Sequence, residues 1–539
     1  MGLLLQLSWH PTQVLTTLTF SFGIYGFFKL LHYIYSQFAC PLRDLPGPPN
    51  GSLLWGNSRE MWEGELCAVQ EKWVQNYGET YRFYGPLSST RLFSMDVKLI
   101  NHVLSNCDNY QKPEGVIYGI KRMVGEGVLV VEGDRHKRQN PAFGPRQIRE
   151  ITEIFVEKSI ELRDIWISEA SKQNTDETCT IDALSWLSRT TLDVIGLAGF
   201  NYKFDTLTKS PETDELSSAF AVVFKAGMKL DFIAILRGMF PFTRFLRAPR
   251  DKEVNLAKTK MFQIATDLLE ESKASLSRDG DTKSSSRDLL SVLVRANTIT
   301  TLSSTQRLTD DEVLAQIPTF LVAGHETTSV ATTWAIYALT QSKDVQAKLR
   351  AELLGMSTDN PSMDELNSLP YLDLVVRETL RLHSPVSGFM RMAMKDEVVP
   401  LNTPFVDRHG NSRSELLIKK GTILNVPVVV LNTAKSIWGD DAKEFKPGRW
   451  EELPEAVSSI PGVWSNMMTF LGGPRACIGY RFSIVEMKTI LFTLVRAFEL
   501  DLAVPGSDIV KKSGLIRRPV LVTDNSNQLP LVIRPLTHS

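Results

Sequence analysis

A single cysteine on a glycine-rich turn constrains this chain more than any other feature. Residues Phe470–Gly479 read FLGGPRACIG, and a segment with helical spacing of apolar residues follows. A helix that starts after Cys477 would place backbone N–H groups and the positive end of the helix dipole beside the sulfur, which stabilises a thiolate. The glycines would let a flat cofactor approach the backbone, and Phe470 would cover the sulfur and limit water. The turn therefore predicts a cysteine that acts as a metal ligand or as a nucleophile.

The other cysteines and the charge balance narrow the class of protein. Cys40, Cys67, Cys107 and Cys179 show neither the spacing of a zinc site nor that of a disulfide framework, which is typical of a reducing compartment. The 539 residues include 60 basic and 61 acidic side chains, so the net charge of −1 gives no reason to expect a nucleic-acid partner. A mean hydropathy of −0.09 excludes a polytopic membrane protein.

The N-terminal segment suggests a membrane anchor. Residues Val14–Tyr35 contain no acid and a single lysine, and a bilayer core requires about 20 apolar residues in a helix. A cleaved signal peptide and a buried core helix are the alternatives, but no small-residue cleavage site follows cleanly and the segment is N-terminal. The prolines that come next predict a stiff spacer. We therefore expect a membrane anchor over residues 1–40, a proline-rich hinge over residues 41–51 and one large domain over residues 52–539.

The rest of the chain is predicted to be mainly α-helical with small β-sheets. Apolar residues recur every three or four positions in residues 150–170 and 182–198, which predicts amphipathic helices. Short strands are predicted at Thr80–Tyr84, Arg91–Ser94, Leu416–Ile418 and Thr422–Pro427. The polar run Ser272–Arg287 is typical of a surface loop. No glycine-rich nucleotide-binding motif is present, and His325-Glu326 lacks the second histidine of a zinc-protease motif.

The cysteine turn resembles a known cofactor-binding loop. Its sequence matches every fixed position of FxxGxRxCxG, the haem-ligand loop of the cytochrome P450 family. Two further segments, Asn140–Gly144 and Thr191–Gly196, are most similar to those of fungal (basidiomycete) microsomal members. The resemblance implies the cytochrome P450 fold and a haem b whose iron takes its axial thiolate from Cys477, with Phe470 beside that ligand.

Three charged residues resemble a structural network of the same family. Glu378 and Arg381 lie one helical turn apart within Tyr371–His383, so a carboxylate and a guanidinium share one helix face. The resemblance implies that Arg449 joins them in a buried cluster behind the haem loop. Gly448, where many members carry a polar residue, is a small departure from the family pattern.

A second segment resembles the helix that crosses the distal side of the haem. Thr309 and Glu312 form a predicted capping box at the start of about 30 helical residues, about 45 Å long. Within it, Ala323–Thr328 reads AGHETT, and a mid-helix glycine beside threonine is unfavourable for helix stability, which points to a functional site. The resemblance implies that the helix opens here to hold water and that Glu326 and Thr327 are the catalytic pair that delivers protons to dioxygen. A solvent-facing, threonine-rich turn is the alternative.

Two arginines and a histidine are the candidates for binding the haem propionates, because anionic carboxylates require charged donors. Arg475, in the cysteine turn, and Arg391 match family positions with this role. The resemblance adds His136, at a position that is usually Trp or His; an ordinary surface histidine is the alternative.

The chain departs from the family just after His136. About one helical turn is missing between Gln139 and Asn140, where related sequences carry a further arginine. Either the shorter segment is tolerated, with Arg138 or Lys137 in place of that arginine, or it marks an incorrectly assembled sequence or an impaired protein.

The resemblance implies a monooxygenase that acts on an apolar organic substrate such as a terpenoid, a steroid or an aromatic xenobiotic. The chain has no flavin or nicotinamide motif, so electrons are expected from NADPH through a separate reductase, with cytochrome b5 as a second donor. Arg481 and Lys488 are candidates for the docking face. Three apolar segments would line the substrate pocket or pack in the core: Val116–Val130, Phe220–Leu236 and Val386–Met390. The expected location is the endoplasmic reticulum membrane, with the catalytic domain facing the cytosol.

Three alternatives remain open at this stage. A reductase-independent haem-thiolate isomerase commonly lacks the acid–threonine pair that this chain has. A catalytically impaired haem-binding protein would follow from the shortened segment. A membrane-tethered scaffold without haem is opposed by the complete cysteine motif.

Overall fold

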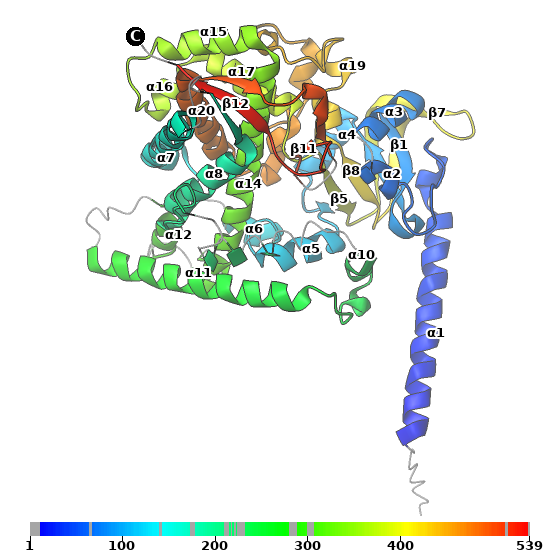
Figure 1. Ribbon diagram of the computed structural model, residues 1–539. Helices are drawn as coiled ribbons and strands as arrows, with labels where there is room; N and C mark the ends of the chain where they lie inside the picture. Colours follow the sequence, from blue (N-terminus) through cyan, green and yellow to red (C-terminus); the bar gives the residue numbers. More distant parts are fainter. Residues whose placement is uncertain are drawn as a thin grey trace, which may run out of the picture.

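A long N-terminal helix extends away from a mainly helical body in the computed structural model (Figure 1). The structure describes residues 11–63, 67–138, 143–172, 178–209, 215–216, 218–219, 222–223, 232–279, 288–298, 307–512 and 516–536. Helix α1 spans Pro11–Phe38, and its C-terminal part is tied to the body where the Tyr33 hydroxyl donates to the Leu87 carbonyl at 2.9 Å. Across the described ranges, no helix combines the length and the apolar character needed to cross a bilayer, so the predicted anchor is not confirmed.

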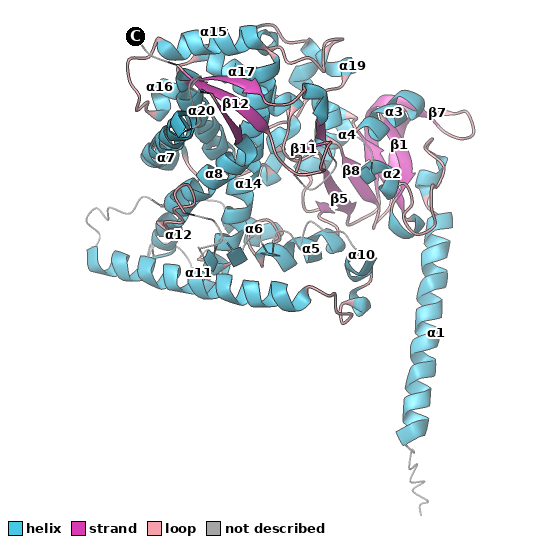
Figure 2. Ribbon diagram, viewed as in Figure 1, coloured by secondary structure: helices cyan, strands magenta, loops and turns pink. Residues whose placement is uncertain are grey.

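Helices make up most of the body, as the sequence predicts (Figure 2). In chain order they are α2 (Ser58–Glu63), α3 (Ala68–Tyr77), α4 (Val97–Ser105), α5 (Glu114–Val124), α6 (Gly133–Arg138), α7 (Pro145–Lys172), α8 (Ala183–Phe200), α10 (Phe232–Met239), α11 (Asp251–Asp279), α12 (Leu289–Thr298), α13 (Asp310–Leu314), α14 (Gln316–Gln341), α15 (Lys343–Leu354), α16 (Met363–Asn367), α17 (Pro370–Leu382), α18 (Val428–Asn432), α19 (Lys435–Trp438) and α20 (Tyr480–Ala497).

Small sheets lie around these helices. The strands are β1 (Thr80–Tyr84), β2 (Thr90–Ser94), β3 (Tyr110–Gln111), β4 (Cys179–Asp182), β5 (Phe389–Ala393), β6 (Glu397–Val406), β7 (Ser412–Ile418), β8 (Ile423–Val426), β9 (Phe498–Leu502), β10 (Ile509–Lys511), β11 (Pro519–Leu521) and β12 (Pro530–Pro535). The largest sheet has the order β1-β2-β8-β5-β3, and its β2–β8 pair is parallel. The others pair β4-β12-β9, β6-β7 and β10-β11.

Helix α14 runs through the middle of the body and positions the site (Figure 1). The predicted capping box begins this stretch: the Glu312 N–H donates to the Thr309 hydroxyl at 3.2 Å, and the Thr309 N–H donates to the Glu312 carboxylate at 3.1 Å. The helix is buried over much of its length, including Trp334, because it packs against α8 on one side and α20 on another. Helix α20 in turn packs on α7, where the rings of Phe155 and Phe482 lie 4.7 Å apart.

Most local predictions agree with these elements. The helices predicted at residues 150–170 and 182–198 correspond to α7 and α8, and the four predicted strands correspond to β1, β2, β7 and β8. The surface-loop prediction for Ser272–Arg287 is wrong over its first half, because α11 continues to Asp279, and residues 280–287 lie outside the described residues. Contacts with other elements hold this end of the helix: Lys273 pairs with Asp310 at 2.6 Å, and the Ser272 hydroxyl lies 3.3 Å from that of Ser291.

Candidate active site

The loop that carries Cys477 is folded tightly, and its glycines make this possible. The Cys477 N–H donates to the Phe470 carbonyl at 2.8 Å, which closes the turn. A Cβ at Gly472 would come within 1.6 Å of the Pro461 carbonyl oxygen, and Gly473 takes a φ of +67°, which side chains rarely adopt. The loop therefore requires glycine at both positions to hold the cysteine where it is.

Cys477 lies two residues before Gly479, the N-cap of α20, so the predicted position beside a helix N-terminus is confirmed. The Gly479 N–H lowers the pKa of the thiol, but burial has the larger effect and raises that pKa to about 11. The helix N-terminus alone therefore does not account for the thiolate expected from the sequence, which a metal ion bound to the sulfur would stabilise. Phe470 is buried beside this turn, with its ring 5.8 Å from that of Trp464 and 6.0 Å from that of Tyr480.

The predicted charge network lies behind this loop and is fully formed. The Glu378 carboxylate accepts from Arg381 at 2.9 and 2.8 Å, from Arg449 at 3.3 Å and from the Trp450 indole at 3.0 Å. Glu378 and Arg381 are completely buried on α17. Each charge is hydrogen-bonded in a place that water does not reach. Removal of one partner would leave the remaining buried charges without full compensation and would destabilise the fold.

Hydrogen bonds connect this network to the cysteine loop. Arg381 donates to the Asn432 carbonyl at 2.9 Å, and the Asn432 side chain accepts from the Met468 N–H at 2.9 Å. The same side chain donates to the Thr469 hydroxyl at 2.9 Å, and that hydroxyl donates to the Leu380 carbonyl at 2.7 Å. The network thus fixes the start of the loop that ends at Cys477.

Thr327 lies on the accessible face of α14. Ala323, Gly324 and Thr327 are half-buried, whereas the residues between and after them are buried. The Thr327 hydroxyl donates to the Ala323 carbonyl at 2.5 Å. The helix is continuous from Gln316 to Gln341, so the opening expected at this point is not seen. Helices open where an inserted group replaces a backbone partner, and here the threonine bonds within its own helix.

Glu326 is buried and held by an arginine from a remote loop. Nε and Nη2 of Arg518 both donate to Oε2 of Glu326, at 3.2 and 2.6 Å. The other carboxylate oxygen lies 4.0 Å from Nε2 of His325, which is hydrogen-bonded to the Ser188 hydroxyl at 2.9 Å. Burial lowers the pKa of His325, which keeps the ring neutral. Sequence analysis identified Glu326 but missed Arg518 and Ser188, because no local pattern connects them to it.

The predicted propionate ligands form a cluster of buried basic side chains. Burial and then the Arg475 charge lower the pKa of His136, and Arg391 and Lys112, the latter missed by the sequence analysis, lie near the same guanidinium. Glu132 is the carboxylate among them: it pairs with Arg475 at 2.5 Å and with Lys112 at 3.1 Å. No sequence motif surrounds Lys112 or Glu132, so their place in this cluster could not be predicted.

The charges in this cluster do not balance. Burial lowers the pKa of His136 to about 4, and the Arg475 and Lys112 charges act in the same direction while Glu132 opposes them. Burial also lowers the pKa of Lys112 and of Arg391. Three permanent cations thus share one carboxylate, which leaves positive charge that two further carboxylates would neutralise.

These residues fit a haem. Among the five cysteines, all within the described ranges, only Cys477 has an exposed surface, although enough protein surrounds its thiol to raise the pKa. Cys477 is therefore accessible from a space that the protein surrounds, as a haem ligand has to be. The excess cations suit the two propionates, and the half-buried face of α14 has no bulky side chain at Ala323 and Gly324. The Thr328 hydroxyl lies 3.1 Å from that of Ser483 on α20, so the helix with the acid–threonine pair contacts the helix that follows Cys477.

Some predictions lie outside what the structure describes. The side chains of Lys137 and Arg138 and the residues Gln139 and Asn140 are not described, so the shortened segment stays a prediction. The same holds for Phe220 and for most of the apolar segment that follows it.

Lys488 was predicted on the docking face, and this prediction is wrong. Its side chain is buried and pairs with Asp373 at 2.8 Å and with Asn367 at 3.0 Å, because it lies on the inner face of α20. Arg481, one helical turn after Cys477, is exposed.

Together, the cysteine turn, the buried charge network and the cation cluster define a protein that holds a haem through a thiolate. Comparison with known proteins agrees. The family model for cytochrome P450 matches residues 44–523. Cytochrome P450 monooxygenase 205 of Postia placenta is 50% identical over 508 residues, which cover 92% of this chain and 93% of that protein. Cytochrome P450 monooxygenase 128 of the same fungus is 47% identical over 522 residues, 94% of this chain and 95% of its own. Cytochrome P450 monooxygenase claQ of Ampulloclitocybe clavipes is 35% identical over 512 residues, 92% of this chain and 93% of its own.

The chain belongs to the cytochrome P450 family, and it is an oxidoreductase of the P450 monooxygenase type. This family binds haem through a cysteine thiolate, so the cofactor expected from the sequence is confirmed. The resemblance to fungal members is confirmed as well, since these relatives are fungal proteins.

Proposed function

We propose that this chain inserts one atom of dioxygen into a C–H or double bond of an apolar organic substrate. The other oxygen atom leaves as water, and each turnover consumes two electrons and two protons. The electrons come from NADPH through a separate reductase, with cytochrome b5 as a second donor. Terpenoids, steroids and aromatic xenobiotics are the substrate classes that we propose.

One observation carries the proposal: Cys477 is presented on a rigid loop whose start is fixed by the buried Glu378–Arg381 pair. When bound, a haem with a thiolate ligand supplies the cleavage of the O–O bond. Cys477 would supply the thiolate that binds the iron, Phe470 would limit water near it, and Arg475, Arg391 and His136 would hold the propionates.

The protons would pass along α14. Glu326 lies beside Thr327 in sequence, and its position is set by Arg518. We propose that Glu326 exchanges protons with solvent and that the Thr327 hydroxyl, now bonded to Ala323, turns to donate toward the substrate side. This pair favours a monooxygenase over the reductase-independent isomerase. The impaired haem-binding alternative depends on residues 139–142.

We also propose that the protein resides at the endoplasmic reticulum membrane, with the residue 52–539 domain in the cytosol behind the hinge at residues 41–51. The support is the surface of α1, which exposes large apolar side chains such as Phe20, Phe27 and Phe28 away from the body. Co-sedimentation of the full chain with vesicles, compared with a chain that lacks residues 1–40, tests this proposal.

The decisive experiment is the carbon monoxide difference spectrum of the reduced full chain. We expect a Soret band at the red-shifted position that thiolate ligation produces, and its loss in Cys477→Ala. Substrate-dependent NADPH consumption with added reductase then tests turnover. A band at the imidazole-like position would contradict the ligand assignment, and a normal band without any turnover across the three substrate classes would favour the impaired alternative.

A further inference from the structure

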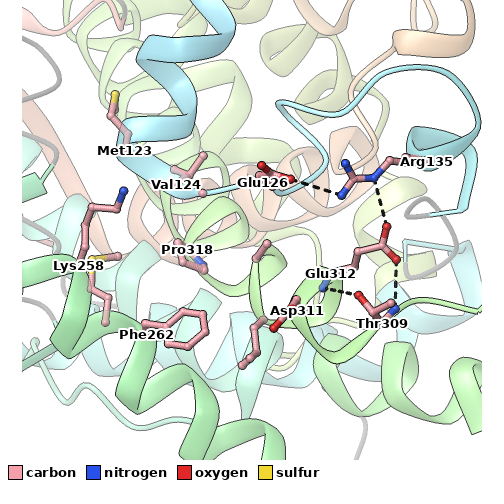
Figure 3. Close-up of a pocket in the computed structure, with 14 residues that line it drawn as sticks. Met123, Val124, Glu126, Arg135, Lys258, Phe262, Thr309, Asp311, Glu312 and Pro318 are labelled. Carbon is pink, nitrogen blue, oxygen red and sulfur yellow. Dashed lines mark hydrogen bonds and ion pairs between the residues drawn. The ribbon is translucent and has the colours of Figure 1, made fainter. Parts of the chain in front are cut away.

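A cavity lies away from the candidate active site, and Figure 3 shows the residues that line it. It has a volume of about 550 Å³ and lies between the end of α5, the middle of α11 and the junction of α13 with α14. Sites for small organic molecules range from about 300 to 1,000 Å³, so this cavity is large enough for one. None of the predicted haem or proton-transfer residues lines it, although residues 123–126 belong to the apolar segment Val116–Val130 that is predicted to line the substrate pocket or to pack in the core.

Most of the cavity wall is apolar. Val124, Met261 and Leu314 are buried beneath it, and Phe262 stands at its edge with 55% of its surface exposed. The exposed ring and the apolar wall beside it remain in contact with water unless a ligand fills the cavity, and burying this apolar surface would favour binding. The wall therefore favours an apolar ligand.

The charged residues on one side of the cavity are one arginine and three carboxylates. Arg135 bridges Glu126 at 3.5 Å and Glu312 at 3.3 Å, and Figure 3 shows this chain of charges on the side away from Lys258. Asp311 lies in the first turn of α13, where the helix N-terminus stabilises a carboxylate. This side therefore offers no cation for an anionic group.

Lys258, on α11, is not paired with a carboxylate in the way that Arg135 is. Across the part of the chain that the structure describes, no acid or hydrogen-bond acceptor pairs with its ammonium group. Its charged neighbours are the cations Lys121 and Arg122, which are already paired with Glu126 and Asp251. Burial and these two cations lower the pKa of Lys258. A half-buried ammonium group that faces an apolar cavity is stabilised when an anion binds beside it.

The cavity is separated from the candidate active site by packed chain. The Val128 N–H donates to the Gln316 side chain at 3.1 Å, and a Cβ on Gly127 would come within 2.0 Å of the Thr319 hydroxyl. Pro318, the lining residue of α14 that is nearest to Thr327, lies nine residues or about 14 Å along the helix from it. A molecule in the cavity would therefore lie outside the space above Cys477.

We propose that this cavity is a peripheral ligand site for an apolar carboxylic acid. The hydrocarbon part lies against Met261, Leu314 and Phe262, and the carboxylate pairs with Lys258. The proposal does not depend on turnover, so its failure and the failure of the monooxygenase proposal would be seen in different measurements.

Fluorescence titration of the haem-loaded full chain, in a non-ionic detergent, tests this proposal. The probes are a dansyl-labelled undecanoic acid and its methyl ester, which differ only in charge at the head. The Soret band, followed in the same cuvette, reports any probe that enters the haem site. We expect the acid to bind about tenfold more tightly than the ester, because a charge-assisted hydrogen bond to a half-buried group has about that effect.

Two variants and two matched controls, all on α11, separate charge from shape. Lys258→Gln should remove the preference for the acid, whereas Lys260→Gln, whose lysine pairs with Glu215 outside the cavity, should keep it. Phe262→Ala should weaken both probes about fivefold, whereas Leu256→Ala, exposed on the same helix, should weaken neither. Equal binding of acid and ester to the unmodified chain, or an unchanged preference in Lys258→Gln, would overturn the proposal.

Discussion

Arg518 and Glu326 form a partly buried ion pair although they lie 192 positions apart in the sequence. Two nitrogens of the guanidinium converge on one carboxylate oxygen. The neighbouring Arg517 fixes the loop that carries Arg518: its N–H donates to the Pro385 carbonyl at 2.9 Å, and its carbonyl accepts from the Trp334 indole at 2.6 Å. The acid of the proposed proton path is therefore positioned by the C-terminal part of the chain.

Replacement of Arg518 should impair proton delivery without loss of the cofactor. In Arg518→Gln the Glu326 carboxylate loses its anchor, and we expect product formation per NADPH to fall about tenfold, below the full effect of removing a general acid. Arg518→Lys should retain part of the activity, because the charge remains. Product yield, peroxide release and the solvent isotope effect are the measurements. Arg534→Gln, which breaks a surface pair with Glu499, serves as the control. An unchanged yield in Arg518→Gln would show that Glu326 needs no positioning.

Replacement of Arg381 should prevent stable haem incorporation. Removal of one partner from a buried charge cluster costs about 3–5 kcal/mol, and here the loss would also leave Glu378 with a buried charge and loosen the loop of Cys477. We expect Arg381→Ala to purify with little or no haem and a lowered Tm. Arg377→Ala, on the same helix but half-buried with Asp373, should keep its haem. Normal haem content in Arg381→Ala would contradict the structural role.

The parts of the site that the sequence predicted correctly are those with local spacing. Cys477 was placed at a helix start because glycine and proline determine the turn before it, and Glu378 and Arg381 were paired because a helix repeats every 3.6 residues. The helices and short strands were predicted for the same reason, since their apolar periodicity is local.

The parts that the sequence did not predict depend on contacts between distant segments. Arg518, Lys112 and Glu132 occupy ordinary loop positions, and only the tertiary fold brings them to Glu326 and Arg475. Lys488 shows the opposite case. A lysine is usually exposed to solvent, but the Lys488 side chain is buried and pairs with a half-buried acid.

Removal of the Thr327 hydroxyl should uncouple electron input from product. The hydroxyl is on the accessible face of α14, bonded only to a carbonyl of its own helix, so Thr327→Ala should leave the fold intact. We expect peroxide release to rise and product per NADPH to fall severalfold, with Thr327→Ser close to the unmodified chain. Thr332→Ala is the matched control, because its hydroxyl makes the same type of bond, to the Thr328 carbonyl, in the buried core. Equal coupling in the Thr327 and Thr332 variants would remove Thr327 from the proton path.

His136 should make the cofactor-free protein less stable in acid. Its pKa in the folded chain is about 4, against an ordinary value of 6.5, so the unfolded chain binds more protons between these pH values. The free energy of unfolding should therefore fall as the pH drops through this window, by up to about 3 kcal/mol. In His136→Gln the difference in Tm between pH 7 and pH 4.5 should shrink, whereas His409→Gln, an exposed histidine, should leave it unchanged. Haem binding should also reduce the difference in Tm between pH 7 and pH 4.5 in the unmodified chain, because the propionates supply the negative charge that the cluster around Arg475 lacks. If His136→Gln and the unmodified chain lose stability equally in acid, His136 is not the buried neutral group that the structure places beside Lys112 and Arg475.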